Sequence, residues 1–192
     1  MKNVLAIMGS ARKMKNTDTL LDNVLKVFKD KDVEIKKVYL KDLNISLCTA
    51  CNYCGKTGKC AINDDMKQLY DSFNNSDGII VASPLYFNTV SSLTKIMIDR
   101  CQMYWGSKYQ LKNSSIDRNK KRIGMFLCVG GSPYKKDQFN ACIPVMDLFF
   151  KAINANYKYN FFVSNTDKEK ICDREDILKK AYEVANEFFN DL

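Results

Sequence analysis

Short apolar runs recur along the chain, and charged or turn-forming residues bound each of them. Five runs have the length and composition of β-strands, at residues 4–8, 33–40, 78–83, 123–129 and 157–163. Between them, apolar residues return every three or four positions, which is the spacing of one face of an amphipathic helix. This spacing predicts helices around residues 20–28, 66–73, 93–101, 139–153 and 177–189. Pro144 is expected to kink the fourth helix or to mark a restart within it.

Strands that alternate with helices predict right-handed βαβ units and a mostly parallel α/β sheet with helices on both faces. For five strands, the natural doubly wound solution is the flavodoxin-like strand order 2-1-3-4-5. The 192 residues contain no repeat, linker or low-complexity tract, so one domain over residues 1–192 is expected. Two irregular stretches interrupt the alternation, a cysteine-rich insertion at 44–63 and a loop at 102–122. Loops of this length are usually functional.

Composition removes several classes of function. The chain has no histidine, which excludes imidazole metal ligands and Ser-His or Cys-His catalysis. The formal net charge is +8, yet the lysines are scattered and form no recognisable DNA- or RNA-binding motif, so no nucleic-acid partner is expected. Neither an export signal nor a membrane span is visible. Eight cysteines in such a chain point to a reducing, cytoplasmic compartment.

The segment GSARKMKNTDTLL, which begins at Gly9 after the first predicted strand, has the residue types of a phosphate-binding loop. In an open α/β sheet, ligands bind beyond the carboxyl ends of the strands, where neighbouring connections diverge. Gly9 permits a sharp turn there, and hydroxyl groups that can donate to phosphate oxygens follow at Ser10, Thr17 and Thr19. Arg12 adds positive charge beside the free amides of the next helix. The pattern is neither GxGxxG nor a nucleotide-hydrolysing loop, and a plain turn followed by a helix cap is the alternative.

Two further loops fall at the ends of neighbouring predicted strands. After the third strand, Pro84 fixes the backbone, and Tyr86 and Phe87 offer flat apolar surface. After the fourth strand, Gly130 and Gly131 allow the backbone to approach a ligand closely, and its amides could face a ring carbonyl. One loop for a phosphate and two for a planar ring describe an FMN site at this edge of the sheet.

Three longer patterns contain these loops, namely GSARKMKNT from Gly9, SPLYFNTVSSLTKIMIDR from Ser83, and GGS from Gly130. They resemble GSPRxxxNT, SPVYFGxVSAxLKxxIDR and GGS of the NAD(P)H-dependent FMN reductase family, and most of all its iron-sulfur flavoprotein branch. The resemblance implies that the phosphate is held by Ser10, Arg12, Asn16 and Thr17. It implies that the ring is lined by Pro84, Leu85, Tyr86, Phe87 and Asn88, with Gly130, Gly131 and Ser132 forming the loop at its pyrimidine edge. Ala11 and Lys15 stand where the family usually has proline and often has glycine, which could loosen the loop.

A compact cysteine array follows the second predicted strand. In CTACNYCGKTGKC, the spacing C-x2-C-x2-C-x5-C is formed by Cys48, Cys51, Cys54 and Cys60. Thiolates at successive x2 spacings can wrap a cuboidal cluster, as in ferredoxins, with the fourth ligand after a glycine-bearing turn. Structural zinc more often uses two CxxC pairs separated by a longer excursion. The family resemblance also implies a four-iron four-sulfur cluster here, while zinc, a disulfide or empty reduced thiols stay open as alternatives.

The other acids and cysteines have simpler interpretations. Asn63 or Asp64 is expected to cap the helix that follows the array, so neither Asp64 nor Asp65 needs a catalytic role. Core packing is predicted for the cysteines that occur singly in apolar patterns or near a helix start, Cys101, Cys128, Cys142 and Cys172.

Flavin chemistry suits a chain without histidine, because hydride reaches the flavin N5 without a side-chain acid or base, and no catalytic residue is assigned. The first hypothesis is an enzyme that moves electrons from NAD(P)H or a ferredoxin-like donor to a quinone, flavin, nitroaromatic or iron-sulfur acceptor, through the cluster where one is present. The second is a non-enzymatic flavodoxin-like carrier, although such carriers are usually acidic. A regulatory or metal-storage module is the third. By resemblance, the protein is a homodimer or homotetramer with residues 44–63 and 102–122 at the interface.

Overall fold

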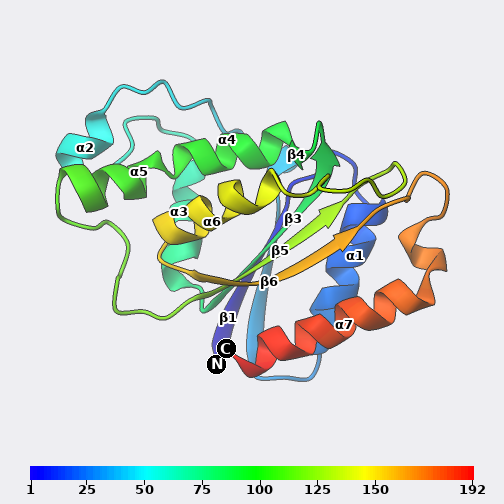
Figure 1. Cartoon of the computed structure of the whole chain (residues 1–192). Helices are drawn as coiled ribbons and strands as arrows, with labels where there is room; N and C mark the ends of the chain where they lie inside the picture. Colours follow the sequence, from blue (N-terminus) through cyan, green and yellow to red (C-terminus); the bar gives the residue numbers. More distant parts are fainter.

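The computed structural model describes residues 1–192, and strands and helices alternate along it (Figure 1). The strands are β1 (Lys2–Met8), β2 (Val33–Tyr39), β3 (Gly78–Tyr86), β4 (Thr89–Val90), β5 (Ile123–Val129) and β6 (Asn156–Val163). The helices are α1 (Asn16–Leu25), α2 (Tyr53–Thr57), α3 (Met66–Asn75), α4 (Ser92–Arg100), α5 (Gln102–Trp105), α6 (Cys142–Ala152) and α7 (Glu175–Asn190). Single tight turns form η1 (Lys26–Phe28), η2 (Leu40–Asp42) and η4 (Ile171–Asp173), and η3 (Gly106–Gln110) is a π-helical turn.

The long strands form a parallel sheet in the order β2-β1-β3-β5-β6. Counted along the chain without β4, this is the order 2-1-3-4-5, so the flavodoxin-like fold class is confirmed. The extra strand β4 is two residues long and pairs antiparallel with the end of β3. It is too short for hydrophobic periodicity to reveal, and it turns the loop after β3 into a hairpin.

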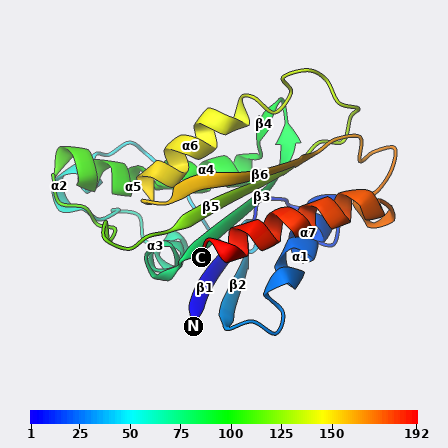
Figure 2. The same cartoon turned by 60° about the horizontal axis from the view of Figure 1, so that its bottom comes forward.

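Each face of the sheet carries its own apolar core. Along β3, Ile79 and Val81 belong to one core, whereas Ile80 and Ala82 belong to the other, as the alternation of side chains in a strand requires. Figure 1 and Figure 2 show α3, α4 and α6 over one face and α1 and α7 over the other. The central strands β1, β3 and β5 are buried on both faces, which is why each is an uninterrupted apolar run in the sequence.

Two expectations about helices are wrong. α6 begins at Cys142 after a series of turns, so Pro144 lies in its first turn, where no intrahelical partner for an N–H exists. It therefore neither kinks nor restarts the helix. The stretch 102–122 opens with the helical residues of α5 and η3 and is irregular only after them. No helix of the chain combines the length and the apolar character needed to span a bilayer.

The cysteine-rich insertion, which we call the cysteine loop (residues 44–63), lies against α5 and η3 at one end of the molecule (Figure 1). The contact is close, because a Cβ on Gly106 would come within 3.1 Å of the Gly55 nitrogen. The Ser115 hydroxyl also donates to the carbonyl of Gly58. The two stretches that interrupt the alternation are therefore one packed unit.

Candidate functional site

A pocket of about 230 Å³ lies where β1, β3 and β5 end, and we call it the carboxyl-edge pocket. The loops after these three strands meet there with the connection from β6 to α7. Its lining consists of Ser10, Arg12, Lys15, Asn16, Thr17, Pro84, Leu85, Tyr86, Val129, Gly131, Ser132, Thr166 and Asp167. The structure thus brings all three sequence-derived loops to one place, and it adds Lys15, Val129, Thr166 and Asp167.

Gly9 determines how the first loop leaves β1. Its N–H donates to the Ala82 carbonyl at 2.7 Å, and its carbonyl accepts from the Ser91 hydroxyl at 2.6 Å. A Cβ on Gly9 would lie 2.0 Å from Thr94 Oγ1 and 3.0 Å from the Ala82 oxygen. Glycine is therefore needed at this position because the backbone packs closely against β3 and α4. The φ of Gly9 is ordinary and would suit any residue.

The amino end of α1 has no capping side chain. The backbone N–H groups of Asn16, Thr17 and Asp18 have no acceptor within the protein. Ser10 is buried at the same pocket, and the exposed guanidinium of Arg12 forms no ion pair. Three unused donors, the positive end of a helix and a free arginine together suit an anionic group.

Asp18 braces the loop that precedes α1. Its carboxylate accepts from the Met14 N–H at 2.7 Å and pairs with Lys37 at 2.6 Å. Burial alone would raise the pKa of Asp18, but hydrogen bonds from Lys37, Met14 and Tyr39 hold it below its ordinary value. Met14 has a φ of 54°, so the bond to Asp18 secures a backbone conformation that a methionine seldom adopts. Contacts within the protein therefore hold this loop in shape.

Some predicted residues do not line the pocket. Thr19 lies further along α1 and is absent from the lining. Phe87 and Asn88 form the two-residue turn of the β3–β4 hairpin, with φ of 49° and 57°, and Phe87 is fully exposed at its tip. The Gly130 N–H donates to the Val163 carbonyl of β6, and of the two glycines only Gly131 lines the pocket, beside Ser132. An asparagine before the β-branched pair of β4 is the sequence signal that could have revealed the hairpin.

The fourth wall of the pocket comes from residues that carry little sequence signal. The Asn16 side chain donates to the Thr166 carbonyl at 3.2 Å and accepts from the Ile171 N–H at 3.0 Å. Asn16 thus ties the β6–α7 connection to the first loop. The Asp167 carboxylate lies directly against Gly131. A Cβ on Gly131 would come within 2.4 Å of that carboxylate. The turn-forming residues Ser-Asn-Thr-Asp at 164–167 are the only hint of this arrangement.

The four clustered cysteines border a second cavity, of about 420 Å³, which we call the cysteine cavity. Cys54 and Cys60 are partly buried, whereas Cys48 and Cys51 are exposed. Burial raises the pKa of the Cys54 thiol, and the nearby sulfurs of Cys60 and Cys48 add to the effect. All eight cysteines of the chain are free thiols in the structure.

Arg100, at the end of α4, forms part of the wall of the cysteine cavity and is buried. Its guanidinium pairs with Asp64 at 2.5 Å, donates to the Ser46 carbonyl at 2.9 Å and donates to the Cys60 sulfur at 3.4 Å. Burial would lower the pKa of Arg100, but Asp64 and Cys60 raise it, so the side chain is a buried cation. Its Nε has no hydrogen-bond partner. A buried cation with a free donor suits an anionic group in this cavity.

Asp64 and Asp65 close the base of the cysteine loop. The predicted cap by Asn63 or Asp64 is displaced by one residue, because Asp65 holds the N-cap position of α3 and its side chain caps no N–H of that helix. Asp64 accepts from the Met66 N–H at 3.1 Å and from the Ser46 N–H at 2.8 Å. Asp65 accepts from the Asn44 N–H at 2.7 Å. The role of Asp64 as partner of Arg100 goes beyond capping. The sequence signal that could have revealed this ion pair was an arginine at the end of an amphipathic helix, together with an acid four residues after the last cysteine.

The backbone between the first three cysteines is strained. Ala50 and Asn52 have φ of 52° and 56°, and this left-handed conformation is unfavourable for alanine. No group of three or more Cys, Asp or Glu side chains is arranged to hold a metal ion in this conformation. The structure thus gathers the four cysteines around one cavity without bringing their sulfurs into a ligand set.

The single cysteines follow the prediction with one exception. Cys101, Cys128 and Cys142 are buried in the core, as expected. Cys172 is exposed in η4, so the prediction of core packing is wrong for it. Of the three residues of η4, which lies ahead of α7, only Ile171 is buried.

Comparison with protein families and curated proteins gives a consistent result. The family model described as NADPH-dependent FMN reductase matches residues 2–159. An iron-sulfur flavoprotein of Methanosarcina thermophila is 32% identical over 67% of this chain and 63% of that protein, so the match spans less than two thirds of the relative. An iron-sulfur flavoprotein of Methanocaldococcus jannaschii is 27% identical over 98% of this chain and 96% of that protein.

Solved structures share the fold. An FMN-dependent NADH-azoreductase from Bacillus anthracis, determined in complex with FMN, matches with a TM-score of 0.69 over 97% of each chain. The two sequences are 15% identical. Similarity at this level establishes the arrangement of the elements and leaves the chemistry to be argued from the site.

Proposed function

This chain belongs to the NADPH-dependent FMN reductase family, and we propose that it is an oxidoreductase with FMN in the carboxyl-edge pocket and a four-iron four-sulfur cluster in the cysteine cavity. The proposed donor is a reduced nicotinamide or a ferredoxin-like protein. The proposed acceptor is a quinone, a flavin, a nitroaromatic compound or an iron-sulfur partner. The observation that carries the proposal is that the three loops predicted to hold the phosphate and the ring line a single pocket.

The first loop fits the phosphate end of FMN. Ser10 and Thr17 place hydroxyl groups at the pocket, and the N–H groups at the start of α1 lack acceptors within the protein. The Arg12 side chain is free to pair with a dianion. Asp18 and Asn16 act behind these groups, since one braces the loop and the other joins it to the β6–α7 connection.

The other loops fit the planar end of FMN. Buried Pro84 and half-exposed Tyr86 border the pocket, and Gly131 leaves its N–H without an acceptor in the protein. FMN, when bound, supplies hydride acceptance at N5 and one-electron transfer. An amide beside the ring stabilises negative charge there, and an aromatic side chain limits access to it. These residues position the cofactor, and no side-chain acid or base is required of them.

The cysteine cavity fits a cluster by its donor set. Four thiols border it, and the buried Arg100 cation adds a guanidinium nitrogen that has no partner. Both curated relatives described above are iron-sulfur flavoproteins. A cluster, when bound, supplies one-electron transfer. Cys48, Cys51, Cys54 and Cys60 are the proposed ligands, and Arg100 would offset the negative charge of their thiolates.

α4 links the two proposed sites. Ser91, the capping residue at its start, donates to the Gly9 carbonyl beside the phosphate loop, and Arg100 at its end contacts Cys60. A helix of nine residues is about 13 Å long at 1.5 Å per residue. The walls of the two sites are therefore joined by one short rigid element, which supports electron exchange between them.

Flavin titration tests the assignment of the pocket. Arg12→Ala should weaken FMN binding by roughly tenfold to a hundredfold, the loss expected for one charge-assisted contact. Lys13→Ala is the matched control, because Lys13 is the next residue in the loop but pairs with Asp42 and does not line the pocket. Equal affinity of Arg12→Ala and the unaltered protein would show that the phosphate assignment is wrong.

Steady-state turnover separates the enzyme from a flavodoxin-like carrier. An oxidoreductase of this kind should oxidise NADH or NADPH with a quinone, nitroaromatic or free flavin acceptor. A carrier would bind FMN and turn over none of these pairs. The formal net charge of +8 favours the enzyme, because small flavin carriers are usually acidic.

A further inference from the structure

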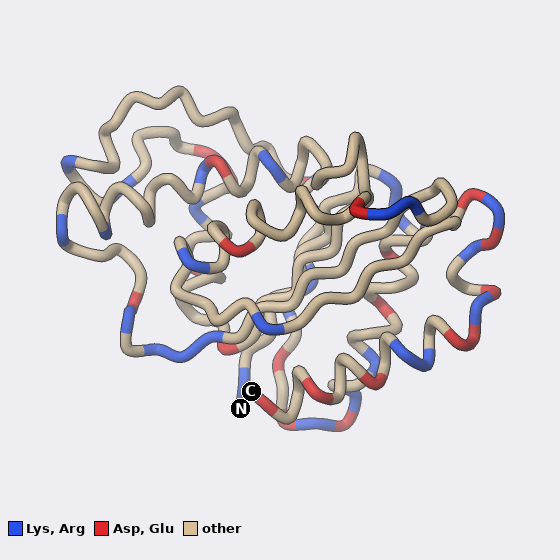
Figure 3. Tube along the Cα trace, in the orientation of Figure 1, with Lys and Arg blue, Asp and Glu red and all other residues tan.

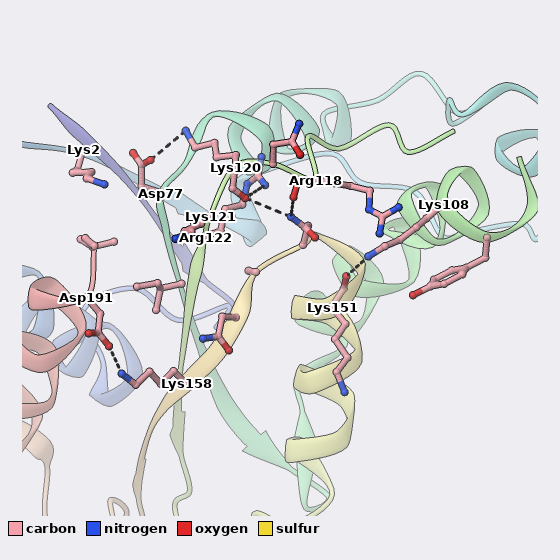
Figure 4. Close-up of a pocket in the computed structure, with 17 residues that line it drawn as sticks. Lys2, Asp77, Lys108, Arg118, Lys120, Lys121, Arg122, Lys151, Lys158 and Asp191 are labelled. Carbon is pink, nitrogen blue, oxygen red and sulfur yellow. Dashed lines mark hydrogen bonds and ion pairs between the residues drawn. The ribbon is translucent and has the colours of Figure 1, made fainter. Parts of the chain in front are cut away.

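A third cavity, of about 740 Å³, lies at the opposite edge of the sheet from the carboxyl-edge pocket, where the strands begin (Figure 4). Its walls come from the starts of β1 and β5, from η3, and from the ends of α6 and α7. We call it the basic cavity after its charged lining, which is Lys2, Lys108, Arg118, Lys120, Lys121, Arg122, Lys151 and Lys158 against Asp77 and Asp191. Figure 3 shows basic positions gathered along the loop into β5. The volume lies within the range of ligand sites, roughly 300–1,000 Å³.

The two acids of the basic cavity already have partners. Asp77 pairs with Lys120 at 3.3 Å, and Asp191 pairs with Lys158. Lys151 pairs with Asp147 on its own helix at 2.6 Å. Five cations have no carboxylate partner, and one of them, Arg122, is taken up by backbone carbonyls. The cations that stay free are Lys2, Lys108, Arg118 and Lys121.

Two of these free cations are directed toward each other. Figure 4 shows the side chains of Lys108 and Arg118 approaching from opposite walls, and Lys108 donates only to the Lys151 carbonyl, at 3.2 Å. Burial and the nearby charge of Arg118 both lower the pKa of Lys108. Like charges held together in a hollow without a counter-ion repel each other, and a multivalent anion would relieve that repulsion.

Hydrogen bonds hold the loop at residues 117–122, which carries two of the free cations, Arg118 and Lys121. Arg122 is buried, and its guanidinium donates at 2.8 to 3.1 Å to the backbone carbonyls of Phe73, Asn74, Asp117 and Lys120. The Asn154 amide donates to the Arg118 carbonyl at 3.2 Å. Residues 117–122 contain no helix or strand, yet two side chains hold them in one conformation. The backbone that carries Arg118 and Lys121 is thus preorganised, which lowers the entropic cost of binding a ligand.

We propose that the basic cavity binds a small molecule with several phosphate groups, and that Lys108, Arg118 and Lys121 are its main phosphate contacts. Lysine and arginine donors are the usual partners of phosphate oxygens. Tyr109 also lines the cavity and is half exposed, and its ring centroid lies 4.2 Å from that of Trp105. Its exposed ring offers an aromatic surface to the base of a nucleotide. The site is at the opposite edge of the sheet from the carboxyl-edge pocket and stands independently of the proposed function.

Calorimetric titration of the purified protein in buffer with added FMN, first with tripolyphosphate and separately with ATP, tests the proposal at physiological ionic strength. We expect saturable binding at one site per chain, weakened roughly tenfold or more by the double substitution Arg118→Glu with Lys121→Glu. The matched control is Lys179→Glu with Lys180→Glu on the exposed face of α7, which changes the net charge equally. Binding in the control should equal that of the unaltered protein. Binding of tripolyphosphate but not of ATP would identify inorganic polyphosphate as the ligand class. Binding of both would extend the ligand class to nucleotides.

Several outcomes would overturn the proposal. Absence of saturable binding at millimolar tripolyphosphate and ATP would do so, as would equal weakening in the two double variants. Saturable binding of polyglutamate without binding of tripolyphosphate would indicate an acidic protein partner instead. Where the charge-reversed variant fails to fold, Arg118→Gln with Lys121→Gln provides the same test, with thermal melting as the check of folding.

Discussion

The carboxyl-edge pocket and the cysteine cavity are built in different ways. The pocket is assembled from loops that leave buried parallel strands, and backbone contacts such as that of Gly9 with Ala82 fix its walls. The cysteine cavity is formed by a loop that has only the five-residue helix α2, and side-chain contacts from Arg100, Asp64 and Asp65 hold it at its base. Its first cysteines are exposed and its backbone is strained at Ala50.

This difference predicts how each site would depend on its proposed cofactor. Contacts within the protein hold the loops of the pocket, so we expect the proposed FMN to bind with little change in their backbone. The cysteine loop places its thiols around one cavity, and its strain is of the kind that a bound group commonly offsets. The two regions should therefore respond separately to substitution, although α4 connects them.

Removal of one thiol should give the largest effect. Cys54→Ser should lose the iron of the anaerobically purified protein while FMN stays bound, because the thiol is a proposed ligand and lies outside the carboxyl-edge pocket. Iron analysis and the flavin absorbance per chain measure the two quantities. Cys172→Ser, an exposed cysteine far from the array in sequence, is the control and should retain both. Joint loss of iron and FMN in Cys54→Ser would break the separation of the two regions.

Arg100→Met should destabilise the chain by about 3–5 kcal/mol, since it leaves the buried Asp64 carboxylate without its partner. Iron content should fall as well, because the cysteine loop loses the contacts of Arg100 with Asp64, the Ser46 carbonyl and the Cys60 sulfur. Denaturant unfolding checks the first effect. The double substitution Asp64→Asn with Arg100→Met should cost less than the sum of the single changes. A strictly additive cycle would mean that the pair does not act as a unit.

Gly9→Ala should destabilise the protein by roughly 3 kcal/mol and weaken FMN binding, because its Cβ would collide with Thr94 and the Ala82 carbonyl. Gly130→Ala is the matched control, since a Cβ there meets nothing closer than 3.4 Å. Unfolding and flavin titration of both variants give the comparison. Iron content should be unaltered in each, and a loss of iron in Gly9→Ala alone would show that the pocket and the cysteine loop are coupled through α4.

Acidification should give the smallest effect, through Asp18. Its pKa is lowered in the folded protein, so its stabilisation is complete above the unfolded value of about 3.9 and is lost as the pH falls through the lowered folded value. Asp18→Asn should therefore cost about 1–2 kcal/mol at neutral pH and flatten the acid limb of the stability curve. Asp22→Asn removes only the more exposed partner of Lys37 and should leave that limb in place. An unchanged limb in Asp18→Asn would disprove the assignment.

Hydrophobic periodicity predicts the parallel sheet well because each central strand is buried on both faces, and the position of the pocket follows from the ends of those strands. The wall formed by Thr166 and Asp167 cannot be predicted from the sequence, since it depends on a hydrogen bond from the distant Asn16 side chain to the Thr166 carbonyl. The position of Phe87 does not follow from the sequence either. The left-handed conformation of Phe87 and Asn88 in the hairpin turn decides whether this side chain faces the pocket or solvent. The cysteine spacing indicates a cluster, whereas Arg100 enters the site only through the packing of α4 on the cysteine loop.

Anaerobic purification, followed by an absorbance spectrum and iron and zinc analysis per chain, tests the central claim most directly. Two cofactor sites in one chain predict one FMN and about four iron atoms with no zinc. Flavin bands without iron would contradict the cluster, zinc in place of iron would replace it, and a colourless protein that does not take up added FMN would contradict the flavin site itself.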